Sequence, residues 1–360
     1  MSSVFLIKAL QLILSLAILV VLHELGHFIP AKLVKTKVEK FYLFFDWPFS
    51  LFKKKIGDTE YGIGVLPLGG YVKIAGMIDE SMDTEHLNKE PEPWEFRSKP
   101  AWQRLIIMLG GVFVNFILGI FIYIMLMYSY GEKYLPNENV TDGVWVQDSL
   151  AVNLGLQNGD KILRVDGEEI KKFSDITIEF INGSTYTIER NGLAIEKELP
   201  IDFIDKLINR GKNAGMIVSP RSPFMFAKFQ ENSPNANSEL LDKDIVIAIN
   251  GQPLKYQDEV QDILQQNKGE EISLTVKRGT ENKTFNVAVS NKGTLGVIIY
   301  GMGFSDLEKL GYYNLADVNY SFAAAIPAGI NKSYETLTNY VKQLKKIFNP
   351  STGAYKGLGG

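Results

Sequence analysis

The chain has 360 residues, of which 46% are hydrophobic and 22% charged, and its formal net charge is −3. This length has room for about two or three domains, and the slightly acidic balance gives no indication of a nucleic-acid partner. Cysteine is absent, which excludes disulfides, cysteine-ligated clusters and a thiol nucleophile.

The first apolar segment, Val4–Leu22, is interrupted only by Lys8, Gln11 and Ser15 and is long enough to cross a bilayer. A cleaved signal peptide is the alternative interpretation, but it requires a cleavage site of small residues after the apolar stretch. Here the chain continues directly into Val21–Phe28. We therefore expect residues 1–37 to form a first transmembrane helix.

Residues 38–100 are more polar and contain two β-prone runs on either side of Gly69 and Gly70. This pattern predicts a hairpin or a looped pair of strands at the two glycines. The acidic stretch 79–95 follows and is typical of a solvated loop, in which His86 is expected to be a surface residue. We expect residues 38–100 to form one segment between two spans.

A second span is predicted over residues 101–130, since Leu105–Tyr128 carries no charge. Basic residues gather between the two spans, so the positive-inside rule places that segment in the cytoplasm and everything after Tyr128 outside. In a bacterium with two membranes, the domains after the second span would then face the periplasm. The basic residues are Lys32, Lys35, Lys37, Lys40, Lys53, Lys54, Lys55, Arg97, Lys99 and Arg104.

An internal repeat follows, with an offset of 84 residues that aligns Asp160 with Asp244 and Gly167 with Gly251. Each copy has a β-prone run that enters an Asp-Gly or Asn-Gly turn. A repeat of this length is the size of a domain, so we expect two tandem α+β domains. Their predicted bounds are residues 140–217 and 218–304.

The last segment, residues 305–360, is predicted to hold an amphipathic helix over Ser321–Phe348 followed by a loop. Lys332, Glu335 and further lysines make this helix too charged to span a bilayer, although it could lie at a membrane surface.

The chemistry is concentrated in His23-Glu24-Leu25-Gly26-His27, an H-E-x-x-H pattern. On a helix the two histidines lie one turn apart on the same face, where both imidazoles can bind one Zn²⁺ ion. Zinc binds nitrogen ligands tetrahedrally and can keep one position for water. Glu24 is then placed to take a proton from that water. The alternative is that His23 and His27 are ordinary core residues.

The chain resembles the site-2 protease family of intramembrane zinc metalloproteases, and within it the bacterial proteases that regulate the sigma-E response. The likeness rests on Val21–Phe28 and on Leu66–Lys73, which is similar to the membrane-reentrant β-loop of that family. It rests also on Gly111–Gly119, with its G-x-x-x-N-x-x-x-G pattern, and on the tandem repeat, which is similar to paired PDZ domains. The implied fold is a multi-pass α-helical membrane protein with two spans present and later spans missing. To these spans are joined a membrane-associated β-loop and two tandem α+β PDZ-like domains.

The resemblance implies roles for individual residues. His23 and His27 would be zinc ligands, and Glu24 would be the catalytic acid and base. Gly69, Gly70, Tyr71 and Asn115 would contact substrate, although Asn115 could equally serve as a helix–helix contact.

The family completes its zinc site with an aspartate on a later span. The most similar pair in this sequence is Asp166-Gly167, which we expect to form a turn instead of binding a metal. We therefore expect the sequence to be truncated and the third ligand to lie outside it.

The implied function is zinc-dependent intramembrane cleavage of single-span membrane proteins, such as anti-sigma factors and remnant signal peptides, after trimming on the outer side. The resemblance places this activity in the bacterial inner (cytoplasmic) membrane, with the PDZ-like domains in the periplasm, and in a stress response. The PDZ-like domains would bind peptide or protein segments or would act as a size filter, two readings that stay open. Peptide grooves are expected near Val144–Gln147 and Phe224–Lys228, with Gly301–Phe304 as a connector. Rival interpretations are a non-catalytic membrane scaffold with two peptide-binding domains and a different membrane zinc peptidase, such as a prenyl-protein protease.

Overall fold

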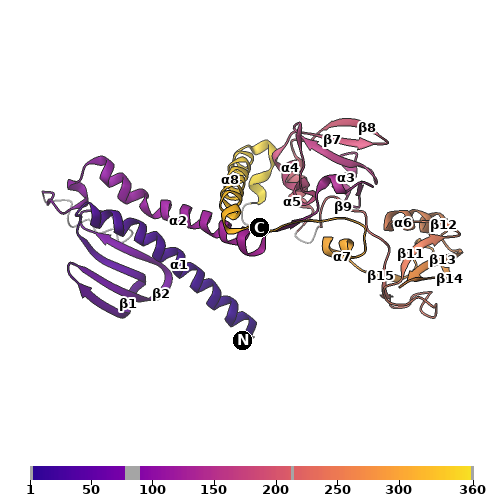
Figure 1. The fold of residues 1–360 in the computed structure, drawn as a ribbon, viewed down its shortest axis with the longest axis horizontal. Helices are drawn as coiled ribbons and strands as arrows, with labels where there is room; N and C mark the ends of the chain where they lie inside the picture. Colours follow the sequence, from indigo (N-terminus) through magenta and orange to yellow (C-terminus); the bar gives the residue numbers. More distant parts are fainter. Residues whose placement is uncertain (1–2, 78–89, 212–214, 358–360) are drawn as a thin grey trace. The chain divides into compact units, whose positions relative to one another are not determined.

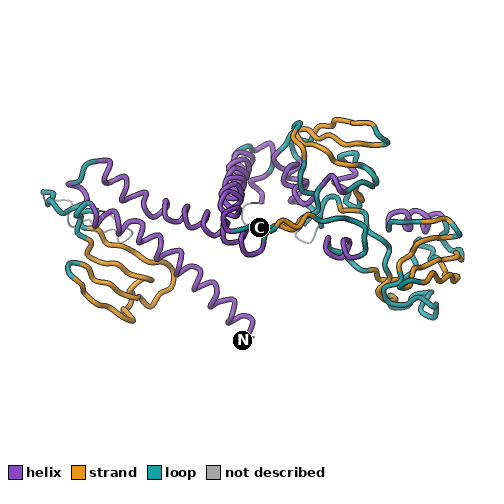
Figure 2. Tube along the Cα trace, in the orientation of Figure 1, coloured by secondary structure: helices purple, strands orange, loops and turns teal. Residues whose placement is uncertain are grey.

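The computed structural model describes residues 3–77, 90–211 and 215–357 (Figures 1 and 2). His86 and most of the predicted acidic loop lie outside the described residues. The chain divides into two compact units, one formed by Met1–Ser129 with Ser321–Ser333 and the other by Tyr130–Tyr320 with Tyr334–Gly360. Each unit is described by itself.

Two long apolar helices dominate the first unit. Helix α1 (Ser3–Leu33) and helix α2 (Ala101–Tyr130) are each long and apolar enough to cross a membrane. Large apolar side chains stay outside the protein core, with Leu14 62% and Phe113 63% exposed. Helices that are apolar on all sides and uncovered by protein are typical of membrane spans.

A curled sheet lies beside α1 in the same unit (Figure 1). Strand β1 (Val38–Ile56) and strand β2 (Thr59–Ile74) are both bent, so that Leu43 pairs with Ile63 on one side and with Gly70 on the other. The sheet, α1 and α2 share a small apolar core that fixes the sheet against the helices. Its buried members are Ala31, Val38, Val72, Ile74 and Ile107.

The prediction of a looped pair of strands at Gly69 and Gly70 agrees with the strand pairing. Residues 61–63 pair with residues 41–43 in the same direction and residues 70–72 pair with them in the opposite direction, so β2 reverses between Ile63 and Gly70. The turn between the two strands lies at Gly57 and Asp58, where Gly57 takes the left-handed φ of +62° that a tight turn requires. Gly70 lies inside β2, where a Cβ atom would come within 2.7 Å of the Tyr42 carbonyl oxygen. The glycine therefore permits a close approach of backbones.

The second unit contains two domains with the same sheet topology, which we call the first and second repeat domains. The first has a four-stranded sheet of order β6-β5-β7-β8, and the second has the order β12-β11-β13-β14. Each domain has its own apolar core, so the repeat in the sequence is a repeat in structure. The strands of the first are β5 (Lys161–Val165), β6 (Glu168–Glu169), β7 (Thr185–Arg190) and β8 (Leu193–Glu198), with helices α3 (Ser149–Asn153), α4 (Ile176–Asn182) and α5 (Phe203–Asn209). Those of the second are β11 (Ile245–Ile249), β12 (Gln252–Pro253), β13 (Glu271–Arg278) and β14 (Glu281–Ala288), with helix α6 (Gln257–Gln266).

The aligned residues Asp160 and Asp244 are both buried carboxylates with the same kinds of hydrogen-bond donor. Each is at most 1% exposed and accepts two hydrogen bonds from one arginine, Arg190 for the first and Arg278 for the second. Each also accepts a backbone N–H from three residues earlier in the chain. A buried carboxylate needs this full set of donors, which is why the same residue types recur at the same places.

The aligned turns also agree with the sequence. Asp166 and Gly167 have φ angles of +48° and +83°, and Asn250 and Gly251 have +50° and +76°, as a type I′ turn requires. The Asp166 side chain accepts the backbone N–H groups of Ser184 and Thr185. Asp166 is therefore a turn residue of the first repeat domain, as expected.

Short strands complete each repeat domain. Strand β4 (Val144–Trp145) pairs with β9 (Ser219–Pro220), and β10 (Phe226–Phe229) pairs with β15 (Val297–Ile299). Neither β4 nor β10 can accept an added strand, because both are bonded on their other edge as well. A cavity lined by Trp145 and Gln147 nevertheless lies at the groove predicted near Val144–Gln147. The Val144 N–H donates to the Asp160 carbonyl, and the Phe226 N–H donates to the Asp244 carbonyl.

The remaining elements lead back to the first unit. Residues 301–303 have no regular structure and run into α7 (Phe304–Lys309), and β16 (Ala316–Val318) pairs with β3 (Glu132–Tyr134). Helix α8 (Phe322–Ile347) then follows close to the predicted bounds. Two short 3-10 turns, Pro350–Thr352 and Ala354–Gly357, stand where a loop was predicted.

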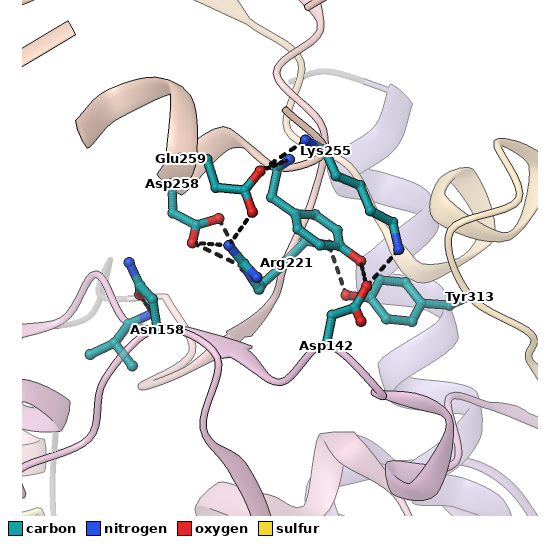
Figure 3. A network of polar contacts seen from close by, with 9 residues as sticks. Asp142, Asn158, Arg221, Lys255, Asp258, Glu259 and Tyr313 are labelled. Atoms are coloured by element: carbon teal, nitrogen blue, oxygen red, sulfur yellow. Dashed lines mark hydrogen bonds and ion pairs between the residues drawn. The ribbon is translucent and has the colours of Figure 1, made fainter. Parts of the chain in front are cut away.

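A network of polar contacts joins the two repeat domains (Figure 3). Asp142 of the first domain accepts from the Lys255 ammonium at 2.5 Å and from the Tyr256 hydroxyl. The Arg221 guanidinium, in the segment between the domains, lies 4.3 Å from the centre of the Tyr256 ring and bonds Asp258 at 2.6 Å. These contacts hold the N-terminus of α6 against the first domain.

Acid should loosen this junction. The hydrogen bonds from Lys255 and Tyr256 hold the pKa of Asp142 below its ordinary value. The contribution of the carboxylate is therefore complete above a pH of about 4 and is lost as the pH falls through the lowered pKa. With spin labels at Leu193→Cys and Asn282→Cys in this cysteine-free chain, the distance distribution should stay narrow from pH 7 to about 4 and broaden below it.

The matched control is Asp142→Asn, which removes the carboxylate at every pH. Its distance distribution should already be broad at pH 7. A narrow distribution at pH 7 in this variant would show that Asp142 does not hold the domains together.

Candidate metal centre

Helix α1 brings His23 and His27 together on one face. Their Nε2 atoms are 3.2 Å apart, and the ring planes meet at 78° with centroids 4.8 Å apart. Two nitrogens bound at about 2.0–2.1 Å to a tetrahedral zinc ion lie roughly 3.3 Å from each other. The pair therefore has the separation that two ligands of one zinc ion require.

A backbone carbonyl of α2 orients the His27 ring. Its Nδ1 lies 2.7 Å from the Ile107 carbonyl oxygen, which can only accept a hydrogen bond. Nδ1 therefore donates to this carbonyl, which leaves Nε2, on the side of His23, as the ring nitrogen that can bind a metal. A hydrogen bond to the second ring nitrogen is the usual support of a metal-binding histidine.

Asn115 of α2 contacts the other histidine. Its side-chain Nδ2 lies 3.1 Å from His23 Nδ1, whereas its Oδ1 is buried without a hydrogen-bond partner. Asn115 thus joins α2 to α1 at the candidate metal ligand. A contact of Asn115 with substrate stays a prediction.

Three glycines set the distance between the two helices at this point. A Cβ atom at Gly26 would come within 2.7 Å of the Gly111 Cα and would overlap the Gly110 carbonyl. At Gly111 a Cβ atom would lie 2.7 Å from His23 Cε1 and 2.8 Å from His23 Nε2 and would overlap His27 Nε2. Gly111 therefore keeps open the space beside both Nε2 atoms, where a metal ion would be held.

Glu24 follows His23 on α1 and is only 8% exposed. Two residues further along α1, Gly26 is in close contact with Gly110 and Gly111 of α2. Among the described residues, no group of three or more His, Cys, Asp or Glu side chains is placed to hold a metal ion. The two imidazoles thus fit zinc as part of a ligand set.

The residues predicted for the β-loop divide into two groups. Gly70 lies against α1, since a Cβ atom added to it would be 2.6 Å from Val20 Cγ1. Val20 lies about one helical turn before His23. Tyr71 and Gly69 contact β1 instead. The Tyr71 ring stacks on Tyr42 with centroids 5.4 Å apart, and its hydroxyl donates to Asp46.

Sequence reasoning missed the Ile107 carbonyl and the role of Gly110. No side-chain pattern marks a carbonyl acceptor on a neighbouring helix. The consecutive glycines Gly110 and Gly111 within an apolar segment were the available signal, since small residues in a span ordinarily mark close helix packing.

Comparison with known proteins identifies the family of this chain. The sequence matches the profile of peptidase family M50 over residues 11–360, nearly its whole length. The chain belongs to peptidase family M50, the site-2 proteases.

Curated relatives match this M50 chain over part of its length. It is 36% identical over 191 residues to a protein of Clostridium perfringens named as a zinc metalloprotease, covering 53% of this chain and 48% of that one. It is 29% identical over 230 residues to the metalloprotease MmpA of Caulobacter vibrioides, covering 60% and 53%. The chain thus spans about half the length of these relatives.

Solved structures give a weaker likeness. The PDZ domain of an SdrC-like protein from Listeria monocytogenes matches with a TM-score of 0.20 and 22% identity, covering 24% of this chain and 92% of that one. The corresponding domain from Listeria innocua matches with a TM-score of 0.20 and 23% identity, covering 22% and 97%. Scores this low assign no fold, and the PDZ-like character of the repeat domains stays a prediction.

Gly111→Ala should weaken Zn²⁺ binding by at least tenfold, because the new Cβ occupies the space beside both imidazoles and separates the ligands. Zinc affinity in detergent, measured by competition with a chromogenic chelator, tests this expectation. Gly119→Ala is the matched control in the same helix, since a Cβ at Gly119 meets no atom within 4 Å. Equal affinities for the two variants would refute the placement of the metal at Gly111.

Proposed function

We propose that this M50 member is a zinc-dependent metalloendopeptidase that cleaves single-span membrane proteins within the bilayer. The observation that carries the proposal is the pair of Nε2 atoms on His23 and His27, 3.2 Å apart on a long apolar helix and next to the buried Glu24. Ionisable groups on such a helix are costly and ordinarily functional. The sequence relationship to proteins named as zinc metalloproteases supports the choice of Zn²⁺.

The residues of the chain would divide the chemistry between them. Zinc, when bound, lowers the pKa of a water molecule and polarises the scissile carbonyl. Glu24 would act as the general base toward the attacking water and as the general acid toward the leaving amine.

The edge of β2 is suited to present the substrate. Within the described residues, Gly70 and Tyr71 pair only with Leu43 and Tyr42, so their other edge has no strand partner. Gly70 also lies against α1 near the histidines. A helical substrate hides its carbonyls in its own hydrogen bonds, and pairing with a free edge would hold it extended for cleavage.

The substrates we propose are single-span proteins already shortened on the outer side, such as anti-sigma factors and remnant signal peptides. The distribution of basic residues supports an inner-membrane protein with periplasmic repeat domains. His23 and Glu24 lie near the end of α1 that precedes these basic residues, so cleavage would fall in the cytoplasmic half of the bilayer.

The second repeat domain supports a role in binding the outer peptide. Within the described residues, β15 pairs only with β10, so its second edge has no partner. A cavity of about 550 Å³ adjoins it and is lined by amide, hydroxyl and aromatic side chains that suit an extended backbone. These observations favour peptide binding over size exclusion alone. The lining includes Trp145, Ser219, Gln257, Gln261, Ile299 and Phe304.

The proposed activity predicts that Glu24→Gln abolishes cleavage while zinc stays bound. The substitution removes the proton acceptor but neither imidazole, so turnover should fall by at least a hundredfold. The probe is a single-span helix with a short outer tag, reconstituted with the protease in liposomes and analysed by mass spectrometry.

His23→Ala serves as the complementary variant, because it should lose both zinc and cleavage. A non-catalytic scaffold would be insensitive to both changes. Cleavage by Glu24→Gln at the rate of the unchanged chain would refute the protease assignment.

Peptide binding by the second repeat domain predicts a specific crosslink. A benzophenone amino acid at Gln261, an exposed residue of the cavity, should crosslink to the outer tag of the same substrate probe. The same photoprobe at the exposed Asn282 on β14 should not. Equal crosslinking at both sites would contradict peptide binding in the cavity and would favour exclusion of large substrates by the domains.

A further inference from the structure

One edge of the curled sheet carries exposed apolar side chains followed by three lysines. Within the described residues, residues 50–56 of β1 pair only with residues 59–64 of β2, so they form an edge of the sheet. We call residues 47–56 the outer strand. Its large apolar side chains come first and are exposed, with Trp47 74% and Leu51 64% exposed. The exposed residues Lys53, Lys54 and Lys55 follow directly.

The charge of these three lysines is not balanced by ion pairs. Within the described part of the chain, none of the three side chains has an ion pair or a hydrogen bond. Glu60, opposite Lys55 in the strand pairing, accepts instead from the Tyr42 hydroxyl at 2.7 Å. Asp46, the one acidic residue among residues 43–52, is paired with Lys40 at 3.3 Å. The lysines are therefore available to an anionic partner.

The basic end of the outer strand lies level with the end of α1. The strands run beside this helix (Figure 1). Ile56 pairs with Thr59, whose hydroxyl donates to the Val38 carbonyl at 2.8 Å. Val38 comes five residues after α1 ends at Leu33. The three lysines are therefore close to the level at which the helix would leave a membrane.

The apolar end of the outer strand lies level with the middle of α1. Phe52 pairs with Ile63, which pairs with Leu43, which in turn pairs with Gly70. Gly70 contacts α1 at Val20. About 20 Å of helix separates Val20 from the end of α1. Apolar side chains are thus exposed at the depth of the hydrocarbon, and the lysines are exposed nearer to its boundary.

Lysines on an edge strand have a simpler explanation in water, where they prevent pairing with strands of other proteins. That role does not account for the exposed apolar residues beside them, which would promote association in water. A bilayer suits both parts, because hydrocarbon covers the apolar side chains while ammonium groups reach the headgroups.

We propose that Lys53, Lys54 and Lys55 bind the phosphate groups of anionic phospholipids in the leaflet that meets this end of α1. The proposal rests on the proposed placement of α1 and α2 across a membrane. Three ammonium groups on one strand would fix the depth of that edge. Because the strands are paired in one sheet, they would also fix the depth of the opposite edge at Gly70, where substrate is proposed to bind.

The test uses the full chain in phosphatidylcholine vesicles with one fluorescent label. Since the chain has no cysteine, Ile56→Cys gives a single bimane label on an exposed position next to the lysines. The quencher is a nitroxide on the acyl chain of phosphatidylglycerol or of phosphatidylcholine, added at equal mole fraction. Quenching by the phosphatidylglycerol probe should be about threefold stronger, because each lysine near the surface attracts anionic lipid. High salt should reduce the difference.

Three sets of substitutions locate the effect. The triple variant Lys53→Gln, Lys54→Gln, Lys55→Gln should be quenched equally by both lipids, whereas arginine at the same positions should retain the preference. The matched control removes the same charge from exposed positions of the second repeat domain and should also retain it. That control combines Lys268→Gln, Lys277→Gln and Lys292→Gln.

A second label position separates this proposal from the one beneath it. Leu14→Cys places the label on an exposed apolar position of α1, where both lipids should quench strongly. Weak quenching there by both would overturn the placement of α1 in the bilayer.

Strong quenching at Leu14 with equal quenching at Ile56 would overturn only the lysine site. A preference that survives in the triple glutamine variant would do the same. Weak quenching at Ile56 by both lipids, with strong quenching at Leu14, would show that protein covers this edge, such as a second copy paired with the outer strand, and would contradict the proposal.

Discussion

The candidate site depends on the contact of two glycine-lined helix surfaces. Gly26 of α1 meets Gly110 and Gly111 of α2 so closely that a Cβ atom on any of them would overlap the opposite helix or the histidines. This separation brings the Ile107 carbonyl within 2.7 Å of His27 and the Asn115 amide within 3.1 Å of His23. In an apolar environment such interhelical hydrogen bonds are the available means of holding two imidazoles in one orientation.

The same helix surface also receives the sheet. Gly70 lets β2 approach α1 beside Val20, and the core that includes Ala31, Val72 and Ile107 fixes this arrangement. A free backbone edge is thereby held near the histidines. The proposed catalytic groups and the proposed substrate-binding edge therefore share one support, and a change in helix separation would affect both.

In the second unit, buried carboxylates with a full set of hydrogen bonds take the place of close helix packing. Asp160 and Asp244 hold equivalent arginines and backbone N–H groups in their own domains. Arg221 and Asp142 extend the same kind of contact across the junction. Charge pairing suits domains in water, where apolar burial supplies the cores and directional contacts set the orientation of each loop.

The sequence by itself determined what local patterns encode: the apolar helices, the H-E-x-x-H spacing, the repeat offset and the type I′ turn at Asp166. Each depends on neighbours a few residues apart or on a comparison of the chain with itself. The looped pair of strands beside Gly70 also follows from local patterns, but the close approach of Gly70 to Val20 and to the Tyr42 carbonyl does not. Only the tertiary structure decided that β4 and β10 have both edges occupied, that Asn115 bonds His23 and that a carbonyl of α2 orients His27. These contacts join residues far apart in the chain, and nothing in the local pattern records which backbone atom will face a given side chain.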